Sequence, residues 1–427
     1  MIKYNQGSKM KVTNQIKKTW HKEWGEVQEK IQTYATAQQA EGPIVQNIQT
    51  MIEKAVALRA SDIHLEGYSE KNIRIRMRID GQLLHYRKLN PTEFSEMLTR
   101  IKVLAKMDIS KNQVPQDGSF INPIGNQYVD IRVSMVPCIY KEKAVLRILD
   151  SQQSLMNYQE LGFSEKQIRT IKQLIHQTNG LILTTGPTGS GKTTTLYRFL
   201  EDLKQESLNI MTIEDPVERK ISYINQMQVN EKTGLGFSKG LRAILRQDPD
   251  VIMLGEIRDA LSAQTAFRAA LTGHLVFSTL HTNNAIASFF RLLDMGLEKY
   301  QIVGALRCII SQKLVRKLCP YCKESSYPDT NACKIFNLEA ERPVYIQHKG
   351  GCEHCQNTGI LGRKGVFEML EINTNMKKAM QNFETGETLT KSALQSGWVP
   401  FKTILRSEII KGEISIIEGL RQIENED

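Results

Sequence analysis

One stretch, residues 181–197 (LILTTGPTGSGKTTTLY), joins an apolar run, a glycine-rich loop and the start of a helical pattern. The loop matches G-x-x-x-x-G-K-[ST], the pattern of a nucleotide phosphate loop. Glycine lets the backbone take positive φ close to phosphates, and the following helix N-terminus supplies N–H donors. Lys192 is expected to bind the β- and γ-phosphates, and the Thr193 hydroxyl to ligate Mg²⁺. The loop residues predicted to bind nucleotide are Gly186, Pro187, Thr188, Gly189, Ser190, Gly191, Lys192, Thr193 and Thr194.

Two glutamates follow other apolar runs and could supply the acid–base chemistry of hydrolysis. Glu214 stands in IEDPVE, where a carboxylate can orient or deprotonate an attacking water, although the segment can also be a plain acidic turn. The run Val251–Leu254 is of the Walker B type, but Gly255 and Glu256 replace its usual terminal Asp. Mg²⁺ would then rest on the loop threonine and the nucleotide, with Glu256 acting on the metal's waters or the attacking water. Which glutamate is the base stays open, with Glu214 favoured.

A histidine and two arginines could respond to phosphate charge. His281 follows the apolar run Leu275–Leu280 and is a candidate γ-phosphate sensor, and His274, before that run, is the weaker candidate. Either histidine can instead be a hydrogen-bonded structural residue. Arg242 and Arg246 are four residues apart, so one helical face would carry both. They can offset transition-state charge or simply remain solvated.

Four of the seven cysteines form a paired C-x-x-C pattern. Cys319 and Cys322 make the first pair, and Cys352 and Cys355 the second. Four thiolates in two knuckles predict a tetrahedral Zn²⁺ site, which is closed and therefore structural. Unlinked thiols or a redox pair are the alternatives, and His354 could compete with Cys355 as a ligand.

The expected strands and helices alternate in the order typical of an open α/β sheet. The strands predicted around the site are Leu181–Thr184, Asn209–Ile213, Val251–Leu254 and Leu275–Leu280. Short apolar strands that alternate with helices favour a parallel sheet covered on both faces. Upstream of them, alternating strands such as residues 73–79 mix with helices in no βαβ order, which indicates an α+β domain. The expected segments are a basic arm (1–40), the α+β domain (41–150), a linker (151–160) and a nucleotide-binding domain (161–427) that includes a cysteine element (314–360) and a helical tail (373–427).

Composition sets the broad class of the chain. Its 427 residues are enough for two or three domains, and no run approaches the ~18 apolar residues of a membrane span. No secretory signal is apparent, so a cytoplasmic location is expected. The net charge of +10 is compatible with nucleic acid, an anionic membrane surface, bound nucleotide phosphates or merely a basic surface.

Four stretches in order, GPTGSGKTTTLY, IEDPVE, RQDPDVIMLGEIRD and TGHLVFSTLHTN, resemble the Walker A, Asp, Walker B and His boxes of the secretion-superfamily ATPases. The chain is most similar to the type II secretion and type IV pilus assembly ATPases, which include competence pseudopilus motors. The upstream stretches ASDIHLE, RIRMRIDG, QDGS, DIRVS and AVLRILD are similar to the family's second N-terminal domain. The resemblance covers residues from about 42 to the C-terminus.

The resemblance implies a RecA-like P-loop ATPase domain preceded by a smaller α+β domain, with a zinc-binding insertion and a helical tail. It implies a homo-hexamer that uses ATP, Mg²⁺ and Zn²⁺, and domain rotation driven by turnover. It assigns functional roles to Arg242, Arg246 and His281, and Arg132 of DIRVS is the candidate that reaches the nucleotide from the N-terminal domain. Ser119 of QDGS stands where the family often has arginine.

The implied partners are a polytopic inner-membrane platform protein and pilus or pseudopilus assembly proteins, which would hold the protein at the inner face of the membrane. The tetracysteine pattern favours an assembly motor, because retraction motors generally lack it. The alternatives are a retraction motor, a nucleic-acid translocase and a nucleotide-binding scaffold. No basic patch interleaved with aromatic residues supports direct nucleic-acid binding.

Overall fold

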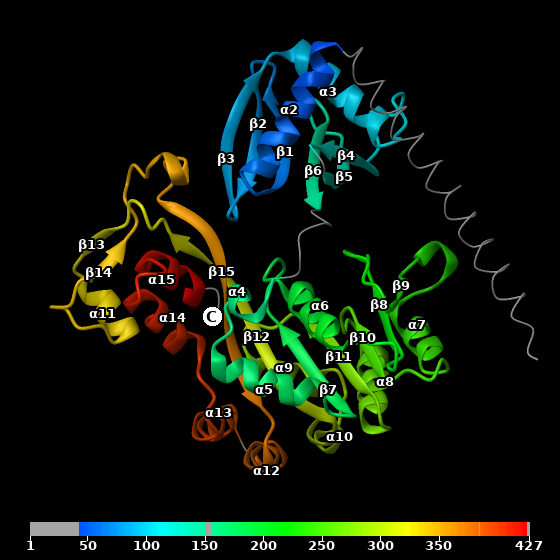
Figure 1. Ribbon diagram of the computed structural model, residues 1–427, viewed down its shortest axis with the longest axis vertical. Helices are drawn as coiled ribbons and strands as arrows, with labels where there is room; N and C mark the ends of the chain where they lie inside the picture. Colours follow the sequence, from blue (N-terminus) through cyan, green and yellow to red (C-terminus); the bar gives the residue numbers. More distant parts are fainter. Residues whose placement is uncertain (1–41, 126, 150–155, 384, 425–427) are drawn as a thin grey trace, which may run out of the picture. The chain divides into compact units, whose positions relative to one another are not determined.

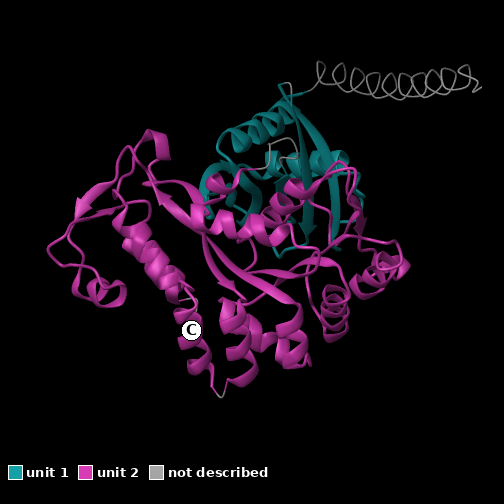
Figure 2. Cartoon of the chain, turned by 60° about the horizontal axis from the view of Figure 1, so that its bottom comes forward, with its two compact units in different colours: residues 1–152 teal, residues 153–427 magenta. Residues whose placement is uncertain are grey.

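The structure is a computed structural model that describes residues 42–125, 127–149, 156–383 and 385–424. The basic arm expected at 1–40 lies outside these residues. The chain divides into two compact units, residues 1–152 and 153–427 (Figure 2). Among the described residues, no helix is both long enough and apolar enough to cross a membrane.

In its described residues, unit 1 is a six-stranded antiparallel sheet with two helices (Figure 1). Its order is β3-β2-β1-β6-β5-β4. The strands are β1 (Ala60–Ser69), β2 (Asn72–Ile79), β3 (Gln82–Leu89), β4 (Gln116–Ile124), β5 (Gln127–Val136) and β6 (Lys143–Leu149). The helices are α2 (Pro43–Ala57) and α3 (Pro91–Leu104). The apolar positions of the alternating strands pack with these helices in one core, so the unit is α+β.

The other face of the unit 1 sheet is charged. On β1, Asp62 and Glu66 are buried, and arginines of the neighbouring strands pair with them. The Nε atom of Arg76 lies 2.8 Å from Glu66, and the Nε atom of Arg147 lies 3.1 Å from Asp62. The alternation of Arg and Ile along residues 73–79 therefore separates an ionic face from the core face.

Unit 2 contains a seven-stranded sheet of order β15-β12-β7-β11-β10-β8-β9. All neighbours are parallel except the β12–β15 pair. The strands are β7 (Gly180–Thr185), β8 (Ile210–Glu214), β9 (Asn225–Gln228), β10 (Val251–Leu254), β11 (Leu275–Leu280), β12 (Leu306–Leu318) and β15 (Ile360–Glu371). The four strands predicted from the sequence form the parallel centre of this sheet.

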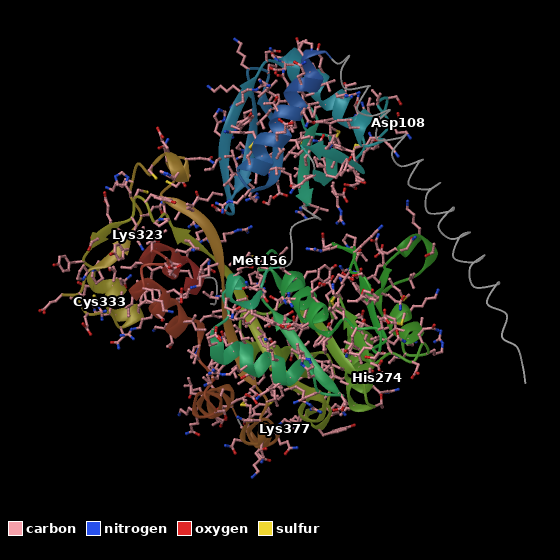
Figure 3. All side chains as sticks on the ribbon, viewed as in Figure 1. Asp108, Met156, His274, Lys323, Cys333 and Lys377 are labelled. Atoms are coloured by element: carbon pink, nitrogen blue, oxygen red, sulfur yellow. The ribbon has the colours of Figure 1, made fainter. Side chains whose placement is uncertain are left out.

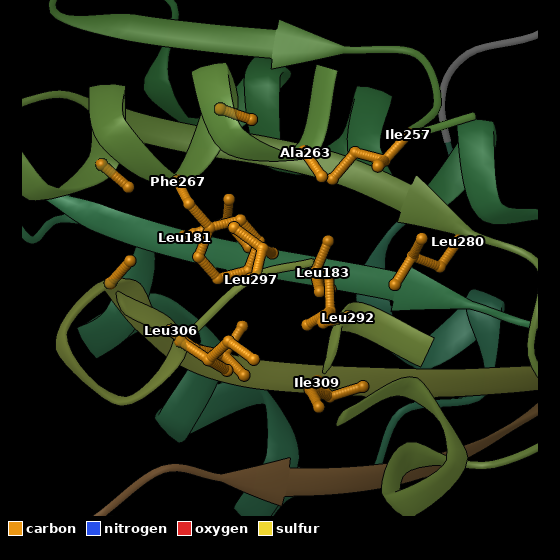
Figure 4. Packing of buried hydrophobic residues seen from close by; sticks show 14 of the residues in the cluster. Leu181, Leu183, Ile257, Ala263, Phe267, Leu280, Leu292, Leu297, Leu306 and Ile309 are labelled. Carbon is orange, nitrogen blue, oxygen red and sulfur yellow. The ribbon is translucent and has the colours of Figure 1, made fainter. Parts of the chain in front are cut away.

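Helices cover both faces of the unit 2 sheet. One face packs with α4 (Tyr158–Leu161), α5 (Glu165–Ile175) and α6 (Lys192–Leu203). The other packs with α7 (Phe237–Ile244), α8 (Ala260–Leu271), α9 (Ala285–Asp294) and α10 (Lys299–Ala305). Leu181 and Leu183 of β7 belong to the second core together with Phe267 (Figure 4). Ile182 belongs to the first core. The central strands are apolar throughout because both of their faces are buried.

The tetracysteine element, residues 319–359, joins β12 to β15. It contains β13 (Glu324–Ser326), α11 (Thr330–Phe336), β14 (Val344–Ile346) and the short 3₁₀ helix η2 (Glu353–Cys355). A second 3₁₀ helix, η1 (Glu231–Thr233), follows β9. The tail forms α12 (Thr374–Asn382), α13 (Gly386–Gln395), α14 (Phe401–Ile410) and α15 (Ile416–Glu424). The first two tail helices join the main core and the last two pack beside the tetracysteine element.

Two expected boundaries need correction. The cysteine element was expected from residue 314, but β12 continues to Leu318 because Val315 and Leu318 are buried and the strand pairs with β15. The linker was expected to reach residue 160, but α4 begins at Tyr158. Asn157 and Glu160 form a capping box there, and burial of Tyr158 anchors the short helix.

Candidate active site

The phosphate loop lies between the end of β7 and the start of α6. Gly186 and Gly191 have φ of +144° and +89°, which side-chain-bearing residues rarely adopt. A Cβ atom on Gly186 would also lie 2.2 Å from the Gln312 carbonyl oxygen. Thr193 and Thr194 are exposed in the first turn of α6, where helix N–H groups can receive an anion.

Lys192 is buried beneath the loop. Its Nζ atom donates to the carbonyl oxygens of Gly186 at 2.8 Å and Pro187 at 3.1 Å. Burial lowers the pKa of Lys192 to about 8, although the charge of Glu256 opposes the shift. The ammonium group is thus held inside the loop by two carbonyls and is poised to exchange them for phosphate oxygens.

The other candidate residues stand at the carboxyl ends of neighbouring strands. In the sheet, β7 lies beside β11, β11 beside β10, and β10 beside β8. Thr282 donates its backbone N–H to the Thr185 hydroxyl, and the Thr279 hydroxyl donates to the Gly255 carbonyl. These bonds tie the loops after β7, β11 and β10 together, so the sheet edge gathers the phosphate loop, Glu256 and His281.

Glu256 is the centre of an ionic cluster. Arg258 donates its Nε–H to Glu256 at 2.6 Å, and the His281 Nε2 atom lies 3.3 Å from the second carboxylate oxygen. Arg258 also lies 3.3 Å from Asp215, which follows β8. Hydrogen bonding to Glu256 raises the pKa of Arg258. The structure thus joins two predicted residues, Glu256 and His281, through a carboxylate that is 19% exposed.

Glu214 has different surroundings. Its side chain is 3% exposed and accepts hydrogen bonds from Thr212 at 2.6 Å and Gln226 at 3.1 Å on one oxygen. The hydroxyl of Tyr197 donates to the other oxygen. Burial, together with the negative charge of Glu214, raises the pKa of Tyr197. The carboxylate of Glu214 is therefore engaged by its own unit and holds α6 against the end of β8.

The predicted arginines do not join this cluster. Arg242 and Arg246 are exposed at the end of α7, and Arg246 donates to the Arg242 carbonyl. Within the described residues, neither is hydrogen-bonded or ion-paired to the phosphate loop, Glu256 or His281. Arg132 is half-buried on β5 of unit 1, opposite Arg147 of β6. His274 lies before β11, at the amino-terminal end of the strand, and bonds the Ala269 carbonyl (Figure 3).

The four predicted cysteines come together in unit 2. Their sulfur atoms all lie within 4.8 Å of one another. The Cys319–Cys352 and Cys322–Cys355 sulfur separations are 3.7 and 3.8 Å. These match the edge of a tetrahedron with Zn–S bonds of ~2.3 Å. His354 stacks instead on the exposed ring of Tyr321, with ring centroids 4.1 Å apart.

Hydrogen bonds from the backbone support thiolate character in the second knuckle. Burial raises the pKa of Cys355, but N–H groups of Cys352 and Gly359, each 3.1 Å from its sulfur, outweigh that effect and lower the pKa to about 6. Thiolates are the form that binds zinc. The donor set and spacing are thus compatible with a structural Zn²⁺ ion.

Some site residues were missed from the sequence. Tyr197, Arg258 and Gln312 contact Glu214, Glu256 and the phosphate loop, respectively. Arg258 is two residues after Glu256, so its spacing was a usable signal. Tyr197 lies on the helix that the loop motif predicts, but its spacing does not show that it contacts Glu214. Gln312 lies on β12, a strand that the sequence did not predict, and only the fold reveals its contact with the loop.

Comparisons with known proteins agree with this geometry. Residues 37–422 match the profile of the family described as "Type II/IV secretion system protein". The chain belongs to this family. It is 40% identical over 384 residues to type II secretion system protein E of Pseudomonas aeruginosa, covering 90% of this chain and 76% of that protein. It is 40% identical to the type IV pilus assembly ATPase TfpB of Acinetobacter baylyi, covering 89% of this chain and 65% of that protein.

Two solved structures share the fold. The pilus retraction motor PilT with bound ADP is 27% identical with a TM-score of 0.59, and the match covers 88% of this chain and 96% of that one. The ATPase DotB of Legionella pneumophila is 21% identical with a TM-score of 0.65, covering 90% and 96% of the two chains. The chain is therefore a secretion-family ATPase with the RecA-like fold that the sequence predicted.

Proposed function

We propose that this protein is the Mg²⁺-dependent ATPase motor of a type II secretion, type IV pilus or competence pseudopilus assembly machine. The observation that carries the proposal is the convergence of the phosphate loop, Glu256 and His281 at one edge of the unit 2 sheet. Relatives at 40% identity are named for type II secretion and pilus assembly, whereas the likeness to a retraction motor is weaker. Assembly is therefore preferred over retraction.

In this proposal, the phosphate loop binds ATP through its backbone N–H groups, and Lys192 turns from its two carbonyls to the phosphates. Thr193 and the nucleotide would hold Mg²⁺, which would offset phosphate charge in the transition state. His281, half-exposed beside Glu256, responds to the γ-phosphate. Each of these groups already stands at the sheet edge, so binding needs only local rearrangement.

Glu256 is the better candidate for the general base, although the sequence favoured Glu214. The side chain of Glu214 is buried and each of its carboxylate oxygens accepts a hydrogen bond inside unit 2, which leaves little access for an attacking water. Glu256 is more exposed and its charge acts on Lys192. We therefore propose that Glu256 activates the water and that Glu214 positions α6 through Tyr197.

The arginine contribution would come from outside the cluster. Arg242 and Arg246 are exposed on unit 2, and Arg132 belongs to unit 1. A hexameric ring supplies neighbouring subunits that can bring such groups to a nucleotide, and an arginine at the transition state is worth ~10³-fold or more in rate. We propose that turnover changes the relation of the two units, and that a membrane platform protein transmits this motion to pilin-like subunits.

Lys192→Ala tests the proposal. Loss of the buried ammonium group is expected to lower ATP turnover by at least about 10²–10³-fold, measured as phosphate release. The fold and the zinc content should stay as in the wild type, because the ammonium group of Lys192 bonds carbonyls of the phosphate loop itself. Added DNA should leave wild-type turnover unchanged. Equal turnover in wild type and variant would overturn the proposed function, and stimulation by DNA would favour a translocase.

A further inference from the structure

Gln312, in the middle of β12, is a buried polar side chain aimed at the phosphate loop. It is 2% exposed, and its Nε2 group donates to the Ser190 carbonyl oxygen at 2.7 Å. The residue before it, Ser311, pairs with Thr185 at the end of β7, so Gln312 lies level with Gly186. The backbone of β12 and the loop are also in direct contact, since a Cβ atom on Gly186 would meet the Gln312 carbonyl.

This hydrogen bond fixes the orientation of one peptide group. A trans peptide holds its C=O and N–H in opposite directions. When the Ser190 carbonyl points to Gln312, the Gly191 N–H must point away from β12. Within the described residues, that N–H has no hydrogen-bond acceptor. It is thus free to donate to an anion, together with the first N–H groups of α6.

The peptide needs such a restraint because it precedes glycine. Gly191 sits at φ +89°, and glycine populates positive and negative φ about equally. A flip of the Ser190–Gly191 peptide would turn the carbonyl toward the phosphates and repel them. The donor on Gln312 opposes that flip.

The chemistry of Gln312 points to this role rather than to packing. Its Oε1 atom is buried and has no partner in the part of the chain that the structure describes. An unsatisfied buried polar group is destabilising, and an apolar side chain of the same size would avoid that cost. Ile310, the preceding residue on the same face of β12, is buried and apolar. The amide therefore has a use that a core methionine or leucine would not supply.

We propose that Gln312 is a positioning residue that holds the Ser190–Gly191 peptide with its N–H toward the nucleotide phosphates. The proposal rests on nucleotide binding, as in the proposed function. It concerns only how the phosphate-binding backbone is kept in its binding orientation.

The test variant is Gln312→Met, which keeps the length of the side chain but has no hydrogen-bond donor. It is compared with the wild type and with a matched control, Gln264→Met, on the exposed face of α8. Affinities for ADP and AMP are measured by titration calorimetry, and folding by thermal unfolding. Loss of a hydrogen bond to charged phosphate is expected to weaken ADP binding ~10-fold or more. AMP affinity, the unfolding midpoint and every property of Gln264→Met should change little.

Two results would overturn the proposal. One is ADP binding by Gln312→Met as tight as in wild type, and the other is equal weakening of ADP and AMP, which would indicate a packing role. Gln312→Leu gives a second donor-free variant if the methionine variant folds poorly. The test of Gln312 measures ADP binding and does not need ATP hydrolysis. A wild-type protein that bound ADP but did not hydrolyse ATP would therefore contradict the proposed motor function and leave the role of Gln312 testable.

Discussion

The phosphate loop gathers its binding groups from one short stretch, residues 186–194, whereas the tetracysteine element takes ligands from two knuckles 33 residues apart. The loop is open and lined by backbone N–H groups. The cysteine cluster is closed, with four sulfurs facing one another. The two regions are nevertheless joined by one strand, because β12 carries Gln312 beside the loop and ends immediately before Cys319.

This difference assigns the chemical role to the phosphate loop and a structural role to the tetracysteine element. An open site with free donors can admit and release a substrate, whereas a four-thiolate site leaves no position for one. From Gln312 to Cys319 the extended strand covers roughly 23 Å, at ~3.3 Å per residue. Mutations at sites this far apart usually have additive effects on the free energy of unfolding. We therefore expect that each region can be broken without breaking the other.

The largest expected effect on turnover comes from Glu256→Gln. Removing a general base should lower kcat about 10²–10⁴-fold, while ADP binding and zinc content persist. Glu214→Gln is the matched variant. It should lower turnover less but destabilise unit 2 by about 1–3 kcal/mol, because it disrupts a buried hydrogen-bond network. Steady-state kinetics and denaturant unfolding measure both, and a larger kcat loss in Glu214→Gln would restore Glu214 as the base.

Cys319→Ser breaks the tetracysteine element, and its effect is on stability and not on turnover. Structural zinc stabilises small domains by roughly 10 kcal/mol or more, so losing a ligand should remove the metal and open the element to proteolysis. Affinity for ADP should change by no more than about 2-fold. Cys333→Ser, on α11 of the same element, is the control that keeps its zinc. Zinc retained in Cys319→Ser would contradict the four-cysteine site.

The smallest effect is a pH dependence confined to the phosphate loop. The pKa of Lys192 is about 8 in the free protein, and phosphate anions beside it should raise that pKa. Binding therefore favours the protonated lysine, so ADP affinity should be constant below about pH 8 and fall above it, by up to about tenfold per pH unit. Titration with ADP in EDTA, without metal, measures this. Affinity that rises above pH 8 would refute the assignment.

The sequence determined the parts of each site that are local. The phosphate loop, its lysine and both cysteine pairs are contiguous motifs whose spacing alone implies their chemistry. The four central strands were also predictable, since strands buried on both faces are apolar throughout. β12 and β15 were not, because their polar residues, such as Gln312 and Lys313, are buried by specific partners.

Only the tertiary structure distinguishes the roles of the two glutamates that lie far apart in the sequence. In sequence, Glu214 and Glu256 are both acids after an apolar strand. In the fold, the hydroxyl of Tyr197 and the amide of Gln226 bind the carboxylate of Glu214. Arg258 and His281 contact the carboxylate of Glu256, whose charge acts on Lys192 of the phosphate loop. The order of strands in the sheet brings these partners together, and hydrogen bonding across strands, which no single segment encodes, sets that order.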